Sequence, residues 1–477
     1  MAISYFDYFG TEDFKINNFS FKKFDDNHVL VTTIHGGWIV LDKREFDLLR
    51  FGKLQEDPIL FKKLEKEGII LTGNNEQNVV NAFKSRQSFL FSSVNLHIIS
   101  PTLRCNQRCV YCHAKSKPLD SHGFDMDEET AKATVDFIFQ APVNSMSIEF
   151  QGGEPLVNFP IVEYIIEYSK ELAKKKKKFV RFIMVTNLTL MDHDILKYLI
   201  ENKVSLCTSL DGPEKVHNKN RKYFGGSGTY KDVVHWIDVI KKEYKYPLEA
   251  LPTTTKFSLK YPKEIVDEYV ERGFRLIRMR SLNNAGMAHE LWKKIGYTPE
   301  EYVEFWKNAL EHTIELYNKG VNIKENMSVL VTRKFLTRNY PNYTCWGNPC
   351  GAALSQCAYD YEGNIYACDE ARSFDVFRIG NVKESNYKDV FLSDIVGKIV
   401  SASSGLLNGC EGCVWHPFCG FCMVCTFGQQ GNIIGNMGID NECKIRKSIL
   451  EHILRKIVFS EKDRGILINW ALGREGI

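Results

Sequence analysis

Three cysteines crowd onto one short segment, Cys105-Asn-Gln-Arg-Cys109-Val-Tyr-Cys112, after 104 residues that contain none. Three thiolates at this CxxxCxxC spacing can hold three irons of a 4Fe-4S cube and leave the fourth iron open to an outside ligand. A zinc site is better served by paired CxxC knuckles that close a tetrahedron, and a thioredoxin-like redox site needs only one CxxC. The spacing therefore favours a cluster with one open coordination position.

A second motif, Gly152-Gly153-Glu154-Pro155, follows the next apolar run of the chain. Two adjacent glycines let a ligand approach the backbone closely, and exposed backbone groups can bind an ammonium group. Alone this motif is moderate support for a ligand site. Together with the cysteine triple it is a strong indication of one cofactor pocket.

Ten further cysteines lie between residues 345 and 443, and Cys207 stands alone. Gly363 to Cys368 has the spacing GxxxxC, and Cys410, Cys413 and Cys419 have the spacing CxxCxxxxxC. A zinc ribbon over 410–425 is an alternative, but it would leave the upstream GxxxxC unexplained. Cys207 is interpreted as a small buried apolar residue of a strand.

Residues 94–281 alternate between apolar strands and amphipathic helices, which predicts a parallel sheet of βα units. Six strands are expected, and we interpret them as a partial (β/α)6 barrel of α/β class with its working face at the carboxyl ends of the strands. Both motifs fall at those ends. The strands are expected at 94–99, 145–150, 181–186, 204–210, 248–254 and 274–280.

The N-terminal region is expected to be a separate, winged-helix-like module. His28 to Thr33 and Trp38 to Leu41 flank a Gly-Gly pair, which predicts a hairpin, and two short helices follow. A polar, Asn-rich stretch at 73–78 is the expected linker, with a helix over about 79–89 after it.

Composition restricts the partners. The chain has 477 residues, 44% hydrophobic and 25% charged, and its 62 basic and 59 acidic residues leave a net charge of +3. This balance argues against nucleic acid or membrane as the main partner. No signal peptide or apolar run of 18 residues is apparent, so we expect a cytoplasmic protein with reduced thiols. The expected domains are 1–78, 79–330, 331–448 and a helical tail, 449–477.

The cysteine triple and the GGEP motif resemble those of the radical S-adenosylmethionine (SAM) superfamily. The resemblance implies that a cluster on Cys105, Cys109 and Cys112 binds SAM and cleaves it to a 5'-deoxyadenosyl radical, which abstracts hydrogen from the substrate. Tyr111 is the usual aromatic of this motif, and Gly152, Gly153, Glu154 and Pro155 match the segment that binds the methionine amine. Ser209, in Thr208 to Pro213, matches the ribose-contacting segment, the alternative being a turn cap. Arg221 is a candidate partner for the SAM carboxylate, the alternative being a surface arginine.

The C-terminal cysteines resemble the SPASM extension of this superfamily, which implies two auxiliary 4Fe-4S clusters and three clusters in all. One spacing departs from the SPASM pattern, because Cys422 lies one residue before the expected position at Met423. Cys207, Cys357 and Cys425 are left over, and Cys357 or Cys425 remains an alternative to an assigned ligand. The implied ligands are Cys345, Cys350, Cys368 and Cys422 for the first auxiliary cluster, and Cys410, Cys413, Cys419 and Cys443 for the second.

Asp369 follows Cys368 directly. In the anaerobic sulfatase maturases, which are also SPASM enzymes, an aspartate at this place is a general base, and a carboxylate beside a buried cluster could have a tuned pKa. The alternative is a turn-forming acid. The N-terminal module resembles the peptide-binding domains of maturases that act on ribosomal peptides, where a leader peptide adds a strand to an exposed sheet edge.

Over almost its full length the chain resembles the B-type maturase of the His-Xaa-Ser peptide system, through Asn95-Leu-His97, Gln151, Val185-Thr-Asn187-Leu-Thr-Leu, Cys368-Asp-Glu-Ala-Arg372 and Val414-Trp-His-Pro-Phe-Cys419. We therefore expect a radical SAM enzyme that modifies a small ribosomal precursor peptide, with a low-potential electron donor such as flavodoxin or ferredoxin. A sulfatase maturase that forms formylglycine and a non-catalytic Fe-S electron carrier are the alternatives.

Overall fold

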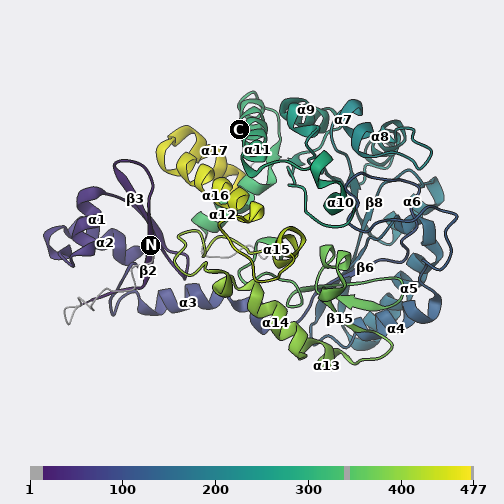
Figure 1. Cartoon of the computed structure of the whole chain (residues 1–477), viewed down its shortest axis with the longest axis horizontal. Coiled ribbons are helices and arrows are strands. Elements are labelled where there is room, and N and C mark those ends of the chain that lie inside the picture. Colours follow the sequence, from purple (N-terminus) through teal and green to yellow (C-terminus); the bar gives the residue numbers. More distant parts are fainter. Residues whose placement is uncertain (1–13, 338–343, 474–477) are drawn as a thin grey trace.

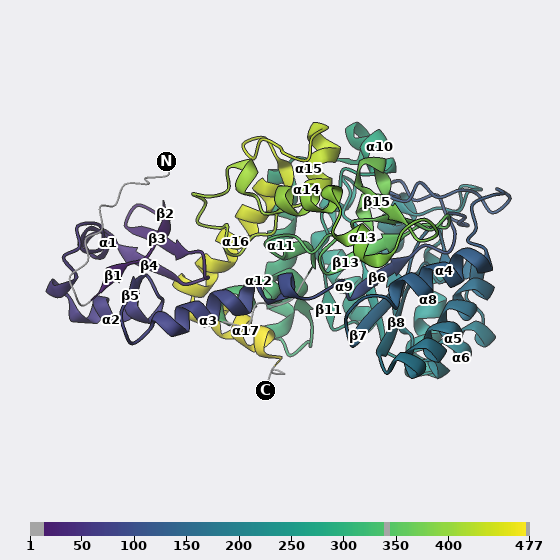
Figure 2. The same cartoon turned by 90° about the horizontal axis from the view of Figure 1, so that it is seen from below.

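The computed structural model describes residues 14–337 and 344–473. Figures 1 and 2 show an elongated molecule with the N-terminal module at one end and the α/β sheet with its helices at the other. The C-terminal helices and loops lie between these two parts, and helix α3 runs from the module toward the sheet.

The N-terminal module is a three-stranded antiparallel sheet with two helices, in which β3 is the central strand. It has its own apolar core, built around Val31, Leu41 and Leu49. The hairpin and both helices predicted from the sequence are present. The elements are β2 (Phe19–Lys23), β3 (His28–Thr33), β4 (Trp38–Asp42), α1 (Lys43–Arg50) and α2 (Pro58–Lys66), with the small pair β1 (Lys15–Ile16) and β5 (Ile70–Leu71).

Helix α3 (Glu76–Arg86) begins three residues earlier than the sequence predicts. The Asn-rich stretch before it is docked, because the side chain of buried Asn75 accepts from Thr72 N and donates to Glu65 O and Ile70 O. The expected linker is therefore partly a fixed turn against α2 and β5. A short 3-10 turn, η2 (Ser88–Phe91), follows α3.

The main sheet has eight strands in the order β10-β9-β8-β7-β6-β13-β14-β15. Five consecutive strands, β6 (Leu96–Ile99), β7 (Ser145–Phe150), β8 (Phe179–Thr186), β9 (Ser205–Ser209) and β10 (Leu248–Leu251), pair in parallel, as predicted. Helices connect them and bury apolar faces against the sheet. These helices are α4 (Glu128–Ile138), α5 (Phe159–Lys176), α6 (His193–Glu201), α7 (Glu214–Asn220), α8 (Tyr230–Asp238) and α9 (Pro262–Glu271).

The strand expected at 274–280 is reduced to β11 (Leu276–Ile277), which pairs with β12 (Lys324–Glu325) outside the main sheet. A single parallel bridge, Thr253 with Arg280, links it to the end of β10. The ladder stops because Arg278 and Arg280 turn toward a cysteine-lined cavity. On the opposite edge, the C-terminal strand β13 (Gln356–Tyr359) pairs in parallel with β6 and extends the sheet.

The remaining strands and helices complete the C-terminal region. The expected boundaries at 330/331 and 448/449 fall inside α12 and α16. No helix of the described residues is long and apolar enough to cross a membrane. The elements are β14 (Asn364–Tyr366), β15 (Arg378–Asn381), α10 (Met287–Ile295), α11 (Pro299–Asn318), α12 (Asn326–Leu336), α13 (Tyr387–Phe391), α14 (Asp394–Ser403), α15 (Met423–Gln430), α16 (Asn441–Phe459) and α17 (Glu461–Leu472).

Candidate active site

The cysteine-triple segment lies after β6 and is held by the GGEP motif after β7. Gly153 N donates to Thr102 O at 2.8 Å, and Glu154 N donates to Arg104 O at 2.9 Å. Gly152 has φ +125°, and a Cβ there would lie 2.5 Å from Thr102 O. The two glycines are therefore required by close backbone packing between the two motifs. This packing fixes the start of the cysteine segment against the sheet.

Two thiols of this segment, those of Cys105 and Cys109, have raised pKa values. Burial raises the pKa of Cys109 to about 12 and that of Cys105 well above its usual value, with neighbouring thiolates adding to the shift at Cys105. Gln107 N donates to Cys105 Sγ at 3.3 Å, and Asn187 Nδ2 donates to the same sulfur at 3.7 Å. Buried thiols with N–H donors suit iron, because the metal charge offsets the cost of forming thiolates. The donor set fits a cluster.

Asp211 lies beside these cysteines and accepts hydrogen bonds from several neighbouring residues. It is fully buried and accepts from Tyr111 Oη at 2.7 Å and from Arg221 Nε at 3.3 Å. The Arg221 guanidinium lies 5.1 Å from the centre of the Tyr111 ring, and its Nη1 is 3.7 Å from Cys109 Sγ. Arg221 is 9% exposed, which excludes the alternative of a surface arginine. The structure thus places Tyr111 and Arg221 together at the cysteine segment.

Glu154 lies at the carboxyl ends of the strands with both oxygens engaged. Oε1 accepts from Thr186 Oγ1 at 2.6 Å, and Oε2 accepts from Asn187 N at 2.7 Å. Burial raises its pKa to about 7, although these hydrogen bonds oppose the shift. Pro155 follows in the 3-10 turn η3 (Pro155–Asn158). A buried carboxylate of this kind can pair with a cationic ligand group.

Ser209 is half-buried at the carboxyl end of β9, on the same side of the strand as Cys207. Cys207 is buried, in agreement with its interpretation as a packed strand residue. After β8, Leu188 has φ +63° and is fully buried. This conformation is in the left-handed region, so the turn after Asn187 carries backbone strain.

Asp369 is buried and lies across from the cysteine triple. Its Oδ2 is 2.9 Å from His113 Nε2, and its Oδ1 accepts from Arg372 Nη2 at 2.5 Å. Burial alone would raise the pKa of Asp369, but Arg372 and then His113 outweigh it and hold the pKa well below its usual range. The carboxyl group is therefore an ionised partner in a buried network, and a turn-forming role alone does not describe it.

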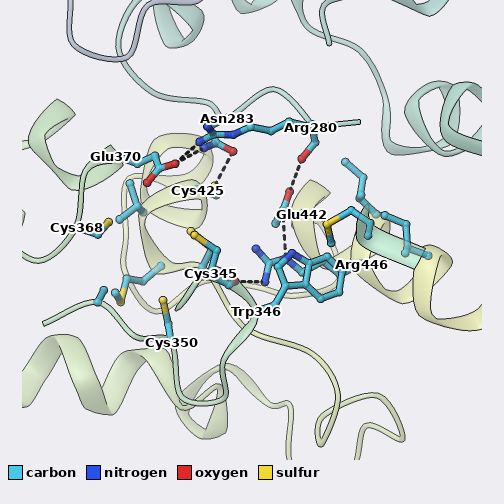
Figure 3. A pocket seen from close by; sticks show the side chains of 18 of the residues that line it. Arg280, Asn283, Cys345, Trp346, Cys350, Cys368, Glu370, Cys425, Glu442 and Arg446 are labelled. Atoms are coloured by element: carbon cyan, nitrogen blue, oxygen red, sulfur yellow. Dashed lines mark hydrogen bonds and ion pairs between the residues drawn. The ribbon is translucent and has the colours of Figure 1, made fainter. Parts of the chain in front are cut away.

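The first auxiliary set of thiols, Cys345, Cys350, Cys368 and Cys422, lines one cavity of about 70 Å³. Figure 3 shows the sulfurs of Cys345, Cys350 and Cys368 turned toward the same hollow. Burial raises the pKa of Cys368 well above its usual value, and nearby acidic and thiol groups add to the shift. Cys425 also lines the cavity and lies 3.6 Å from Asn283 Oδ1, so the choice between Cys422 and Cys425 stays open.

The second auxiliary set, Cys410, Cys413, Cys419 and Cys443, gathers where the 410–419 loop meets the first turn of α16. Burial raises the pKa of Cys419 to about 12, with Arg446 opposing and Cys443 and Cys413 adding to the shift. Burial also raises the pKa of Cys410 to about 11, and nearby Cys413 and Cys443 add to this rise. The four thiols are thus electrostatic neighbours, as the ligand set requires.

Cys357 lies elsewhere, on β13, where its Sγ is 3.2 Å from Tyr359 Oη and 3.6 Å from His97 Nδ1. It is fully buried and absent from the cavity lining. In the described part of the chain, no three His, Cys, Asp or Glu side chains meet closely enough for a single metal ion.

Comparison with known proteins agrees with this geometry. Residues 99–264 match the radical SAM superfamily. A cysteine-type anaerobic sulfatase-maturating enzyme of Clostridium perfringens is 26% identical over 364 residues, covering 74% of this chain and 94% of the relative.

Two groups of solved structures share the fold. A structure of anSMEcpe with bound AdoMet and a Cp18Cys peptide has a TM-score of 0.65 at 23% identity, covering 80% of this chain and 99% of that one. Streptococcus suis SuiB bound to the precursor peptide SuiA has a TM-score of 0.54 at 18% identity, covering 91% and 99%.

The fold and the cysteine triple define a radical SAM domain. The chain therefore contains a radical SAM domain, which indicates an enzyme whose cofactors are a 4Fe-4S cluster and SAM. The narrower His-Xaa-Ser subgroup stays a prediction.

Two residues of the site were missed by the sequence argument. Asp211 falls within the segment Thr208 to Pro213, to which the sequence argument assigns only a ribose contact by Ser209, although a place after a strand and before a Gly-Pro pair is where functional acids of such sheets lie. His113 directly follows Cys112 and was not considered. No local signal indicates that it meets Asp369, because 256 positions of chain separate them.

Proposed function

We propose that this enzyme modifies a small, ribosomally made precursor peptide, abstracting hydrogen from a side chain or backbone carbon to form a thioether, carbon–carbon or related crosslink. The observation that carries this proposal is an open groove beside the N-terminal module. It has a volume of about 920 Å³ and is bordered by β4, α2 and α3. Among the described strands, β4 is an edge of its sheet.

The groove suits an extended peptide. The backbone of an edge strand can pair with an added strand, and Trp38, Ile39 and Val40 of β4 line the groove. Lys62, Lys63 and Lys66 of α2 also line the groove, and with Arg86 and Arg464 they outnumber its two acidic residues, Glu65 and Glu67. A peptide segment with acidic residues therefore fits this surface by charge.

We propose the following roles for the residues that would hold the cluster and SAM. When bound, the cluster and SAM supply a 5'-deoxyadenosyl radical. Cys105, Cys109 and Cys112 hold the cluster, and Gly152 to Pro155 receive the methionine amine, with Glu154 as its carboxylate partner. Arg221 faces the SAM carboxylate, Tyr111 and Asp211 hold Arg221 in place, and Ser209 contacts the ribose.

Asp369 is proposed as the acid–base residue of the peptide modification. Because it is paired with Arg372 and His113, it must loosen these contacts before it can accept a proton, and the adjacent His113 can take the proton onward. The pairing keeps Asp369 ionised and aimed until substrate binds.

Two auxiliary clusters are proposed on the sets Cys345, Cys350, Cys368, Cys422 and Cys410, Cys413, Cys419, Cys443. We assign them to a SPASM domain at 331–448, after a leader-binding module at 1–78 and the radical SAM barrel at 79–330, with the tail at 449–477. A flavodoxin or ferredoxin supplies electrons, and a cytoplasmic location suits the fourteen free cysteines.

A sulfatase maturase is the second candidate. The Clostridium perfringens relative favours it through 26% identity over 74% of this chain. The coverage argues for the peptide maturase instead, because the sulfatase-maturating relative spans 74% of this chain, whereas SuiB, bound to its precursor peptide, spans 91%. The non-catalytic electron carrier is set aside, since the radical SAM domain makes the chain an enzyme.

Coexpression with candidate precursor peptides, namely any short open reading frames beside its gene, followed by mass spectrometry of those peptides, tests the proposal. A mass change is expected with the intact chain. Deletion of residues 1–75 and the double variant Lys62→Glu/Lys66→Glu are expected to reduce modification at least tenfold and leave SAM cleavage intact. Lys197→Glu, on exposed helix α6, is the control. Equal loss of both activities, or modification only of a sulfatase peptide, would contradict the proposal.

A further inference from the structure

Two buried basic side chains, Arg446 and Lys334, lie between the two auxiliary cysteine sets. Their exposed fractions are 4% and 1%. Arg446 is on α16, three residues after Cys443, and Lys334 is on α12. Charged side chains are seldom buried to this extent unless partners compensate them.

Each of these two side chains forms hydrogen bonds to both of the segments that carry the thiols. Arg446 Nη1 donates to Cys345 O at 2.8 Å and also to Gly420 O, which follows Cys419. Lys334 Nζ donates to Trp346 O and, at 2.7 Å, to Phe418 O. Both therefore bridge the segment at 345–346 to the segment at 418–420, one from each proposed cluster site.

Arg446 lines the cavity together with the thiols of the first set, and it lies three residues after Cys443 of the second set on α16. Its guanidinium is 4.8 Å from the Trp346 ring centre, and Nε pairs with Glu442 at 2.7 Å. Figure 3 shows Arg446 stacked beside Trp346 at the edge of the cavity. The side chain is thus fixed in place.

We propose that Arg446, assisted by Lys334, is a positioning residue that sets the reduction potential of the auxiliary clusters and holds them at a fixed separation. This inference rests on the proposal that both cysteine sets carry clusters. A thiolate-bound cluster is an anion, and it becomes more negative by one charge when it accepts one electron from the low-potential donor. A fixed buried cation stabilises the reduced form more than the oxidised form and so raises the potential.

The same helix offers a matched control. Arg455 also pairs with a glutamate four residues earlier, Glu451, at 3.0 Å and donates to a backbone carbonyl, Phe24 O. Its partners belong to α16 and the N-terminal module, and no described thiol contacts it. Arg455→Gln therefore repeats the chemistry of Arg446→Gln away from the proposed clusters.

The test is an anaerobic redox titration, followed by electron paramagnetic resonance, of protein that carries Cys105→Ala, Cys109→Ala and Cys112→Ala, so that only auxiliary clusters report. Iron and sulfide are counted in each sample. Arg446→Gln is expected to lower the midpoint potential of at least one auxiliary cluster by about 59 mV or more. For a one-electron step, this corresponds to a tenfold or larger change in the reduction equilibrium. Arg446→Lys keeps the positive charge, so its midpoint potential should stay close to that of protein with Arg446 intact. Arg455→Gln should leave the midpoint potential unchanged.

The outcomes separate the two proposals. Absence of auxiliary iron in the Cys105/Cys109/Cys112 variant with Arg446 intact would refute the auxiliary clusters themselves. Full iron with an unchanged midpoint in Arg446→Gln would overturn only the role of Arg446. Should Arg446→Gln fail to retain iron, Glu442→Gln, which removes the carboxylate paired with Arg446, is titrated in its place; its midpoint is expected to rise, and an unchanged midpoint there overturns the inference equally.

Discussion

The buried pair of Asp211 and Arg221 should be one of the strongest determinants of stability at the active site. The Asp211 side chain is fully buried, that of Arg221 is 10% exposed, and their closest atoms are 3.3 Å apart. Asp211 also accepts from Asn220 Nδ2 at 3.0 Å and Thr253 N at 3.1 Å. Replacing Asp211 by Asn keeps the shape but leaves the Arg221 charge uncompensated.

The expected cost of Asp211→Asn is about 3–5 kcal/mol of unfolding free energy, which is typical when one partner of a buried ion pair is removed. In the double variant Asp211→Asn/Arg221→Gln no charge is left unpaired. We therefore expect it to be more stable than the sum of the single changes predicts, with a coupling of roughly 0.5–3 kcal/mol. Anaerobic urea denaturation followed by tryptophan fluorescence measures both quantities.

Asp136 provides an exposed counterpart, because it also binds a cation, Lys132, and a tyrosine hydroxyl, Tyr168, each at 2.7 Å. Its side chain is 41% exposed. Asp136→Asn should cost less than about 1 kcal/mol, because water screens a surface pair. Similar costs for the two aspartates, or additive effects of Asp211→Asn and Arg221→Gln, would refute the reasoning.

Two further predictions concern other parts of the barrel. Gly153→Ala should prevent cluster assembly, since its Cβ would lie 2.5 Å from Leu103 O and nearer still to Arg104 O. Gly225→Ala is the control, because a Cβ there meets open space. Equal iron loading of the two variants would exclude this packing argument. Glu149 has a pKa that burial raises to about 7 from 4.5, so the folded chain binds its proton more tightly than the unfolded chain. The free energy of unfolding should therefore fall as pH rises from 4.5 to 7, by at most about 1.4 kcal/mol per pH unit, and Glu149→Gln should lack this part of the slope in urea titrations at several pH values.

The parallel strands could be predicted because each is a short apolar run followed by a helix with a clear 3.6-residue pattern. The sixth strand could not, since Arg278 and Arg280 are directed into a cavity that forms only when the C-terminal region packs there. The same holds for β13, whose pairing with β6 joins residues more than 250 positions apart. Pairings between distant segments leave little trace in a local pattern.

At the site, the spacing of Cys105, Cys109 and Cys112 predicts a common cluster because these cysteines lie on one short loop, and that role stays a prediction. The contact of His113 with Asp369 and the bridging by Lys334 depend on tertiary packing. Arg221 was recognised as a candidate, but its burial on Asp211 needed the structure. The choice between Cys422 and Cys425 stays a prediction, since both line the same cavity.

The central claim is that Cys105, Cys109 and Cys112 hold the cluster that cleaves SAM. The most direct measurement is 5'-deoxyadenosine formation from SAM by anaerobically reconstituted, dithionite-reduced protein, compared with the Cys109→Ala variant. The account predicts product from the intact chain and none from the variant, which should still contain auxiliary iron. Equal amounts of 5'-deoxyadenosine from both proteins would contradict it.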